Sequence, residues 1–190
     1  MCRLGDVEEA LQIFLSADIP RSQITLMHCV SAYPAPEHQL NLRALTTLAT
    51  AFGCPVGYSD HTLGLTAPVA AVALGAVVIE KHLTLDMNLP GPDHRASLEP
   101  DSFAAMVAAI RSCELMLGDG IKQPQSIEMN TRFVARRSLR AARLLNAGEI
   151  LTSSDIVCQR PGDGLSPMLL PQLLGRPTSR QYQPGELIDV

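Results

Sequence analysis

The feature that most constrains the fold is an alternation, over the first two thirds of the chain, between short apolar stretches and segments with helical periodicity. Apolar residues recur at helical spacing over residues 6–16, 40–52, 65–74 and 102–117. Between them lie short, almost wholly apolar runs at residues 24–29, 55–58 and 76–80. Such runs indicate the strands of a buried parallel sheet. The order fits either an open doubly wound sheet or part of a (β/α)8 barrel.

The pattern changes at residues 122–130, which are polar and include Pro124. After this segment, short strand-like runs alternate with turns such as the one at residues 160–164. We therefore predict an α/β domain at residues 1–120, a linker at 121–130 and a small β-rich domain at 131–190.

Charge and cysteine content exclude several classes of protein. The chain has 15 Lys+Arg against 19 Asp+Glu, which argues against a nucleic-acid-binding surface. No apolar run reaches the roughly 18 residues of a membrane span, and no charged segment followed by an apolar one marks a signal peptide. The five cysteines are scattered and form no C-x-x-C pair, as expected of reduced thiols. We expect a cytoplasmic protein that binds neither nucleic acid nor membranes.

Polar residues spaced two apart follow each of the three predicted strands. The pairs are Ser31 and Tyr33, Ser59 and His61, and Glu80 and His82. Residues i and i+2 of a strand share a face, so each pair points one way. Barrels and open α/β sheets both place their active sites at the carboxyl ends of parallel strands. We therefore predict an active site at this edge of the sheet.

Each of these residues also has a purely structural interpretation. A single histidine at a strand end is often only hydrogen-bonded, Glu80 could pair with the adjacent Lys81, and the residues from Ser59 could form an exit loop that caps a helix. Together, however, His61, Glu80 and His82 have the chemistry of a divalent metal site with an acid or base beside it.

Other polar segments have equally simple interpretations. The loop at residues 91–94 adds a carboxylate and an imidazole, or is only a turn. The segment at residues 160–164 could be a tight turn with an arginine on its flank. The arginines at positions 136, 137, 140 and 143 indicate a solvated face or a subunit contact.

Four segments closely resemble the N-acetylneuraminate (sialic acid) synthase family, which includes the legionaminic and pseudaminic acid synthases. They are LMHCVSAYP at residues 26–34, PVGYSDHT at 55–62, VIEKHLTLD at 78–86 and GPDH at 91–94. The chain from about residue 131 resembles the SAF, or antifreeze-like, domain. The resemblance implies the C-terminal three β/α units of a TIM (β/α)8 barrel followed by an SAF domain.

The resemblance also implies a reaction. Phosphoenolpyruvate condenses with an N-acetylmannosamine-type sugar, an N-acetylated hexosamine, to give a nonulosonic acid and phosphate. A divalent metal, Mn2+ or Mg2+, assists. His61 and His82 match the metal ligands and Glu80 matches a catalytic carboxylate.

Five further residues match substrate-binding positions of the family. Asp93 matches a residue that holds sugar hydroxyls, Ser59 a phosphoenolpyruvate contact and Tyr33 a residue of the substrate pocket. Ser31 falls where some members carry Asn. Arg160 matches an arginine that reaches the acylated amine of the sugar from the partner subunit of a domain-swapped homodimer.

The resemblance covers only the later part of such an enzyme. The first five barrel strands, with the phosphate-binding lysines, have no counterpart here, so we expect an exposed sheet edge and an inactive or poorly active chain. The alternative is a non-catalytic sugar-binding or interaction module that uses the SAF-like domain. The Ser31-Ala32-Tyr33 segment resembles the synthases of diacetylated sugars somewhat more than the simple sialic acid type.

Overall fold

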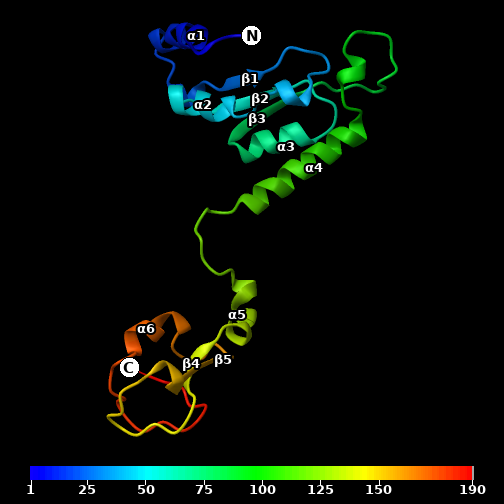
Figure 1. Cartoon of the computed structure of the whole chain (residues 1–190). Coiled ribbons are helices and arrows are strands. Elements are labelled where there is room, and N and C mark those ends of the chain that lie inside the picture. The colour runs from blue at the N-terminus through cyan, green and yellow to red at the C-terminus, as the bar shows by residue number, and fades with distance from the viewer. Residues whose placement is uncertain (190) are drawn as a thin grey trace. The chain divides into compact units, whose positions relative to one another are not determined.

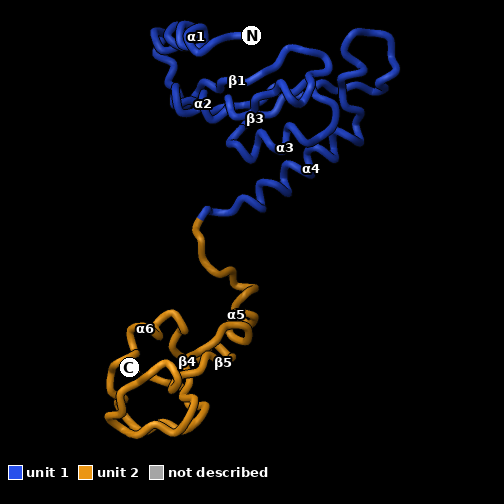
Figure 2. Tube along the Cα trace, in the orientation of Figure 1, with its two compact units in different colours: residues 1–120 blue, residues 121–190 orange. Residues whose placement is uncertain are grey.

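The computed structural model describes residues 1–189 and divides into two compact units, Met1–Gly120 and Ile121–Val190 (Figures 1 and 2). The segment predicted as a linker belongs to the second unit, where it contains the 3-10 turn η4 (Ser126–Glu128) and the start of a helix. Across the described residues, no helix is long and apolar enough to cross a membrane.

The first unit contains four helices and three strands in alternating order. The helices are α1 (Leu4–Ser16), α2 (Ala44–Phe52), α3 (Thr66–Ala73) and α4 (Pro100–Leu117). The strands are β1 (Leu26–Cys29), β2 (Val56–Asp60) and β3 (Ala76–Lys81), and 3-10 turns occur at η1 (Arg21–Gln23), η2 (Glu37–Gln39) and η3 (His94–Ala96).

Two of the differences from the predicted element boundaries bear on the surroundings of the strand ends. Helix α2 begins at Ala44 rather than at residue 40, because η2 and the left-handed residue Asn41 (φ 47°) precede it. Strand β2 continues through Ser59 and Asp60, so these residues are not an exit loop and cap no helix.

The three strands form a parallel sheet in the order β1-β2-β3. Val56 and Tyr58 of β2 pack with Leu45 and Leu48 of α2 and with Ala71 of α3 in one core cluster. Helices α2 and α3 therefore cover the same face of the sheet, and α4 packs against α3 (Figure 1).

The opposite face carries Gly57, Ser59, Val78 and Glu80. A side chain at Gly57 would meet Met27 Sδ at 2.2 Å and the Val78 carbonyl at 2.9 Å, so the neighbouring strands close over this position. The pairing of β2 with β3 shifts at the start of the strands: Val56 pairs with Ala76, whereas Gly57 pairs with Val78. Val77 is the extra residue of this bulge.

The second unit is small and rich in turns. It contains α5 (Met129–Ala135), β4 (Ser138–Ala141), β5 (Ile156–Gln159), η5 (Ser153–Asp155), η6 (Pro167–Leu169) and α6 (Leu170–Leu173). Strands β4 and β5 pair antiparallel, and single bridges join further segments to them. Its core contains fully buried aliphatic residues and Tyr182.

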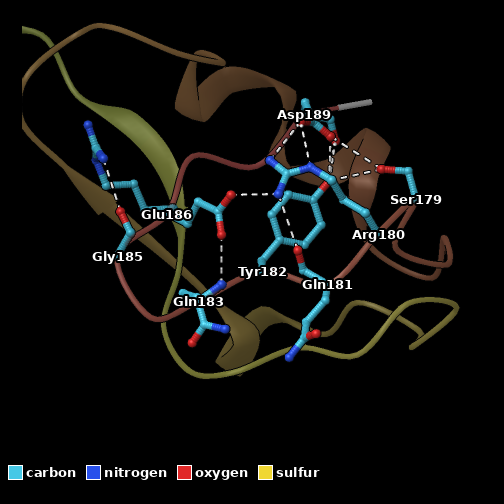
Figure 3. Close-up of polar contacts among 9 residues, drawn as sticks. Ser179, Arg180, Gln181, Tyr182, Gln183, Gly185, Glu186 and Asp189 are labelled. Atoms are coloured by element: carbon cyan, nitrogen blue, oxygen red, sulfur yellow. Dashed lines mark hydrogen bonds and ion pairs between the residues drawn. The ribbon is translucent and has the colours of Figure 1, made fainter.

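Arginines tie the loops of this unit to carboxylates. Arg180 bonds Asp189 and Glu186, and its guanidinium lies 4.3 Å from the centre of the Tyr182 ring (Figure 3). Arg143 bonds Glu149 and Asp155, and Arg140 bonds Asp163. Arg143 is solvent-exposed, as predicted, and both Arg140 and Arg143 also hold loops within the unit.

Candidate active site

The residues after β1, β2 and β3 converge at the carboxyl edge of the parallel sheet, as their spacing predicts. The rings of His61 and His82 lie edge to face with 5.1 Å between their centroids. The Tyr33 ring lies 4.1 Å from that of His61 and 5.6 Å from that of His82. Three residues far apart in the sequence thus form one cluster of rings.

His61 is buried and held at two points. Its Nδ1 lies 3.0 Å from the carbonyl oxygen of Val30, and its own carbonyl accepts from the backbone N–H of Ala35 at 2.8 Å. A carbonyl only accepts hydrogen bonds, so this contact places the proton on Nδ1 and leaves the lone pair on Nε2. Histidines that bind metals typically make such a bond with the ring nitrogen that faces away from the ion.

His82 is less enclosed. Its Nδ1 lies 4.0 Å from Oδ2 of Asp93, which brings the loop at residues 91–94 to the site as predicted. The carbonyl of His82 accepts from the N–H of Leu98 at 2.9 Å, and Leu83 pairs with Leu98 in a short parallel bridge. These contacts anchor the loop that carries Asp93 beside β3.

Ser59 and Glu80 lie next to each other on adjacent strands. The Ser59 hydroxyl donates to Oε1 of Glu80 at 2.6 Å, because their backbones are paired in register. Glu80 does not pair with Lys81, which points to the other face of β3. The structure therefore rejects the ordinary Glu80–Lys81 ion pair.

A buried polar cluster that the sequence did not reveal lies on the helix-covered face, and two of its members immediately precede the two histidines in the sequence. Lys81 Nζ donates to Asp60 Oδ2 at 2.7 Å, and both side chains are fully buried. Tyr58 donates its hydroxyl to Asp60 Oδ1 at 3.0 Å. Burial, together with the adjacent Asp60 carboxylate, raises the pKa of Tyr58.

Two other predicted residues lie in different surroundings. Ser31 is exposed after β1, with its hydroxyl 3.7 Å from Cys29 Sγ. Arg160 belongs to the second unit, where its Nε donates to the carbonyl of Ala135 at 3.0 Å. The adjacent Gly162 N–H donates to the Phe133 carbonyl at 2.8 Å, which fixes the turn that carries Arg160 against the end of α5.

Cys29 was also missed as a residue of the site. Its Sγ lies 3.8 Å from Nδ1 of His61. The spacing rule contained the signal, because Cys29 lies two residues before Ser31 on the same face.

Two imidazoles are suited to a divalent metal here, since the backbone contact of His61 occupies Nδ1 and not Nε2, and the His82 ring is adjacent. Among the described residues, no group of three or more His, Cys, Asp or Glu side chains is arranged to hold a metal.

Comparison with known proteins identifies the family of each unit. Residues 1–122 match the NeuB family and residues 136–189 match the SAF domain. The chain belongs to the NeuB family. This confirms the expected membership of the N-acetylneuraminate synthase family, and the SAF match confirms the resemblance of the second unit.

Two relatives of this NeuB-family chain are named as synthases. It is 44% identical over 188 residues to the N,N'-diacetyllegionaminic acid synthase of Campylobacter jejuni, covering 99% of this chain and 56% of the relative. Identity is also 44%, over 187 residues, to the enzyme of the same name from Legionella pneumophila, covering 97% and 52%.

A solved structure supports the same relationship. The N-acetylneuraminic acid (sialic acid) synthetase of Leptospira borgpetersenii superposes with a TM-score of 0.63 at 39% identity, over 69% of this chain and 45% of that protein. The NeuB-family chain described here therefore spans about half the length of the curated relatives it matches.

Proposed function

We propose that this chain forms the metal-binding and sugar-binding side of a nonulosonic acid synthase. The reaction would join C3 of phosphoenolpyruvate to the aldehyde carbon of an N-acetylmannosamine-type sugar, add water and release phosphate. The observation that carries the proposal is the pair of adjacent imidazoles, His61 and His82, which follow two parallel strands that the Ser59–Glu80 hydrogen bond also joins.

We further propose that the first unit is part of a (β/α)8 barrel. Its strands are adjacent in sequence order, and α2 and α3 cover a single face of the sheet. A doubly wound sheet places helices on both faces, whereas a barrel places all of them outside. The face with Ser59 and Glu80 would then line the barrel interior.

Each strand-end residue has a task in this proposal. His61 and His82 would hold Mn2+ or Mg2+, which supplies Lewis acidity toward the aldehyde oxygen when bound. Glu80 would move a proton to or from the attacking water, and Ser59 fixes one of its carboxylate oxygens.

The remaining predicted residues would hold substrate. Asp93 would bind sugar hydroxyls from its loop beside His82, and Tyr33 and Ser31 would line the pocket next to the histidines. Ser59 would also contact phosphoenolpyruvate. Arg160 would reach the acylated amine of a sugar bound by a second copy of the chain.

The chain matches about half of each relative, so the groups that bind the phosphate of phosphoenolpyruvate would come from outside these residues. An anionic substrate needs such cationic and backbone donors to bind. We therefore expect the chain by itself to be inactive. The 44% identity to two synthases named for a diacetylated product favours a diacetylated sugar.

The first test is metal binding by the purified chain. Titration with Mn2+, followed by the electron paramagnetic resonance signal of free Mn2+, should show a site that His61→Ala and His82→Ala each remove. His38→Ala, at an exposed histidine in η2, is the matched control and should bind as the unchanged chain does. Equal binding by all four proteins contradicts the proposed site.

Activity and sugar binding test the rest. The chain, mixed with phosphoenolpyruvate, sugar and Mn2+, should release no phosphate, and turnover by the chain alone would show that the expectation of inactivity is wrong. Metal-independent sugar binding that persists in the double variant His61→Ala with His82→Ala would favour the non-catalytic module instead.

A further inference from the structure

A fully buried ion pair joins the two strands that end in the candidate metal ligands. Lys81 Nζ lies 2.7 Å from Asp60 Oδ2, and neither side chain has solvent exposure. Asp60 immediately precedes His61, and Lys81 immediately precedes His82. The two strands therefore end in the same arrangement, a buried charged residue followed by an imidazole.

The Asp60 carboxylate controls the backbone on both sides of His61. Its Oδ1 accepts from the backbone N–H of Thr62 at 2.9 Å, in addition to the Tyr58 hydroxyl. Its Oδ2 accepts from the Thr62 hydroxyl at 3.1 Å as well as from Lys81. His61 is thus bracketed by two residues that are bonded to each other.

Lys81 extends this bracket to the next strand. Besides Asp60, its ammonium group donates to the carbonyl oxygen of Thr62. The residue before His82 is therefore bonded to the residues on both sides of His61. Any shift of the end of β3 relative to β2 would break both of these buried contacts.

Side-chain alternation explains why the pair acts through the backbone and does not touch the site itself. Asp60 and Lys81 are paired in register, and both point to the face covered by helices. The residue that directly follows each strand continues the alternation and points to the opposite face, so His61 and His82 meet there. The bond between Asp60 and Lys81 thus fixes the position of His61 relative to His82.

Stability alone does not explain a buried charged pair. Two desolvated charges regain their hydration free energy only with good geometry, and a neutral pair of similar size often gives equal or greater stability. A pair that joins two strands can, however, specify one relative arrangement. The retained charges at this position are explained better by positioning than by folding free energy.

We propose that Asp60 and Lys81 are positioning residues that hold the His61 and His82 rings at the separation a shared divalent cation requires. The inference rests on the proposed function, because it assigns the purpose of the pair to that metal site. It requires no contact between the pair and either metal or substrate. Residues that support metal ligands without touching the ion typically change metal affinity about 10–100-fold when they are replaced.

The decisive variant replaces both charges, Asp60→Asn together with Lys81→Met. The amide of the new side chain can still bond Tyr58 and Thr62, so the turn around His61 keeps its local bonds, and only the links between strands are lost. Each single replacement would leave one buried charge unpaired, which strongly destabilises a fold. The double variant avoids this difficulty.

The matched control removes an ion pair of the same unit that is remote from the strand ends. Arg111 and Glu114 of α4 pair at 2.8 Å with largely exposed side chains. Arg111→Met with Glu114→Gln removes one positive and one negative charge, as the decisive variant does. It should leave both stability and metal binding nearly unchanged.

Two measurements on the 190-residue chain separate this inference from the proposed function. The first is Mn2+ affinity, which should fall about 10–100-fold in the decisive variant and stay constant in the control. The second needs no metal: the nuclear Overhauser effect between the carbon-bound ring protons of the two imidazoles, in protein with 13C-labelled histidine. It should be present in the unchanged chain and the control, and weakened or lost in the decisive variant.

The ring contact decides the inference. A folded decisive variant that keeps the contact overturns positioning, whatever its Mn2+ affinity. Loss of the contact in that variant supports positioning, even if the unchanged chain does not bind Mn2+. Failure of the unchanged chain to bind Mn2+ would contradict only the metal-binding part of the proposed function.

Discussion

The two units of the chain differ in where their exposed apolar side chains lie. The core of the second unit includes Leu139, Leu145 and Tyr182, all at most 1% exposed. In the first unit, Val77 is 67% exposed on the sheet and Leu85, just beyond β3, is 84% exposed. The first unit thus exposes apolar side chains on and just beyond its sheet, whereas exposed apolar side chains of the second unit, such as Phe133 and Val134, lie on α5 and not on its strands.

Separating the units should give the largest effect. Residues 121–190 expressed alone should unfold in one cooperative transition, because that core needs nothing from the first unit. Residues 1–120 alone should bind hydrophobic dyes and self-associate, since an exposed apolar face with unpaired strand edges favours both. Calorimetry and analytical ultracentrifugation check the two outcomes. If residues 1–120 stay monomeric and bind no dye, the exposed apolar side chains of the first unit do not form such a face in solution.

Core truncation should distinguish the units next. Leu145→Ala, at a fully buried position, should cost about 2–5 kcal/mol of the free energy of unfolding of the second unit. Val77→Ala should cost far less, because most of that side chain is already in contact with solvent. Urea denaturation of each variant gives the two values, and similar costs would show that Val77 is covered in solution.

Replacing a glycine by alanine should lower the free energy of unfolding by a smaller amount, and for a different physical reason in each unit. Gly57→Ala should cost about 1–3 kcal/mol because the new methyl overlaps Met27 and the Val78 backbone. Gly148→Ala should cost about 1–2 kcal/mol because φ there is 80°, although the space around it is open.

Asparagine sharpens this test. It tolerates left-handed backbone, so Gly148→Asn should recover part of the loss, whereas Gly57→Asn should be worse than Gly57→Ala. Thermal denaturation of the four variants orders them. If Gly57→Asn is more stable than Gly57→Ala, backbone strain and not close packing determines the cost of replacing Gly57.

Acid should produce the smallest effect, and it should act on the second unit. A hydrogen bond from the Thr152 hydroxyl, with further bonds from the Thr152 N–H and Arg143, lowers the pKa of Asp155. Bonds from Tyr182 and Arg180 lower the pKa of Asp189. A carboxylate with a lowered pKa stabilises the fold at neutral pH, and this contribution is lost as pH falls through the folded-state pKa.

The midpoint temperature of residues 121–190 should therefore stay level from neutral pH to about pH 5 and decline below about pH 4. The variant Asp155→Asn should start lower and decline less steeply. An equal slope in both proteins would show that Asp155 contributes nothing to the acid response.

Local signals in the sequence predicted the strands, the helices and the strand-end residues well. Alternation on a strand depends only on neighbouring residues, so the sequence alone assigns His61 and His82 to one edge of the sheet. It does not reveal the Asp60–Lys81 pair, because that pair depends on the register between β2 and β3, which no single segment encodes. The short helices α5 and α6 were missed because neither is long enough to show helical periodicity.

The bulge at Val77 bears on how the length of β3 can vary. It accommodates one additional residue ahead of the paired stretch, so that Glu80 still lies beside Ser59 and Lys81 beside Asp60. Deleting Val77 would give an unbroken strand and leave those partners in place. An insertion between Ile79 and Glu80 would instead turn Glu80 toward the helices and Lys81 toward the histidines. Insertions and deletions in related sequences should therefore occur at the start of β3 and not within its last three residues.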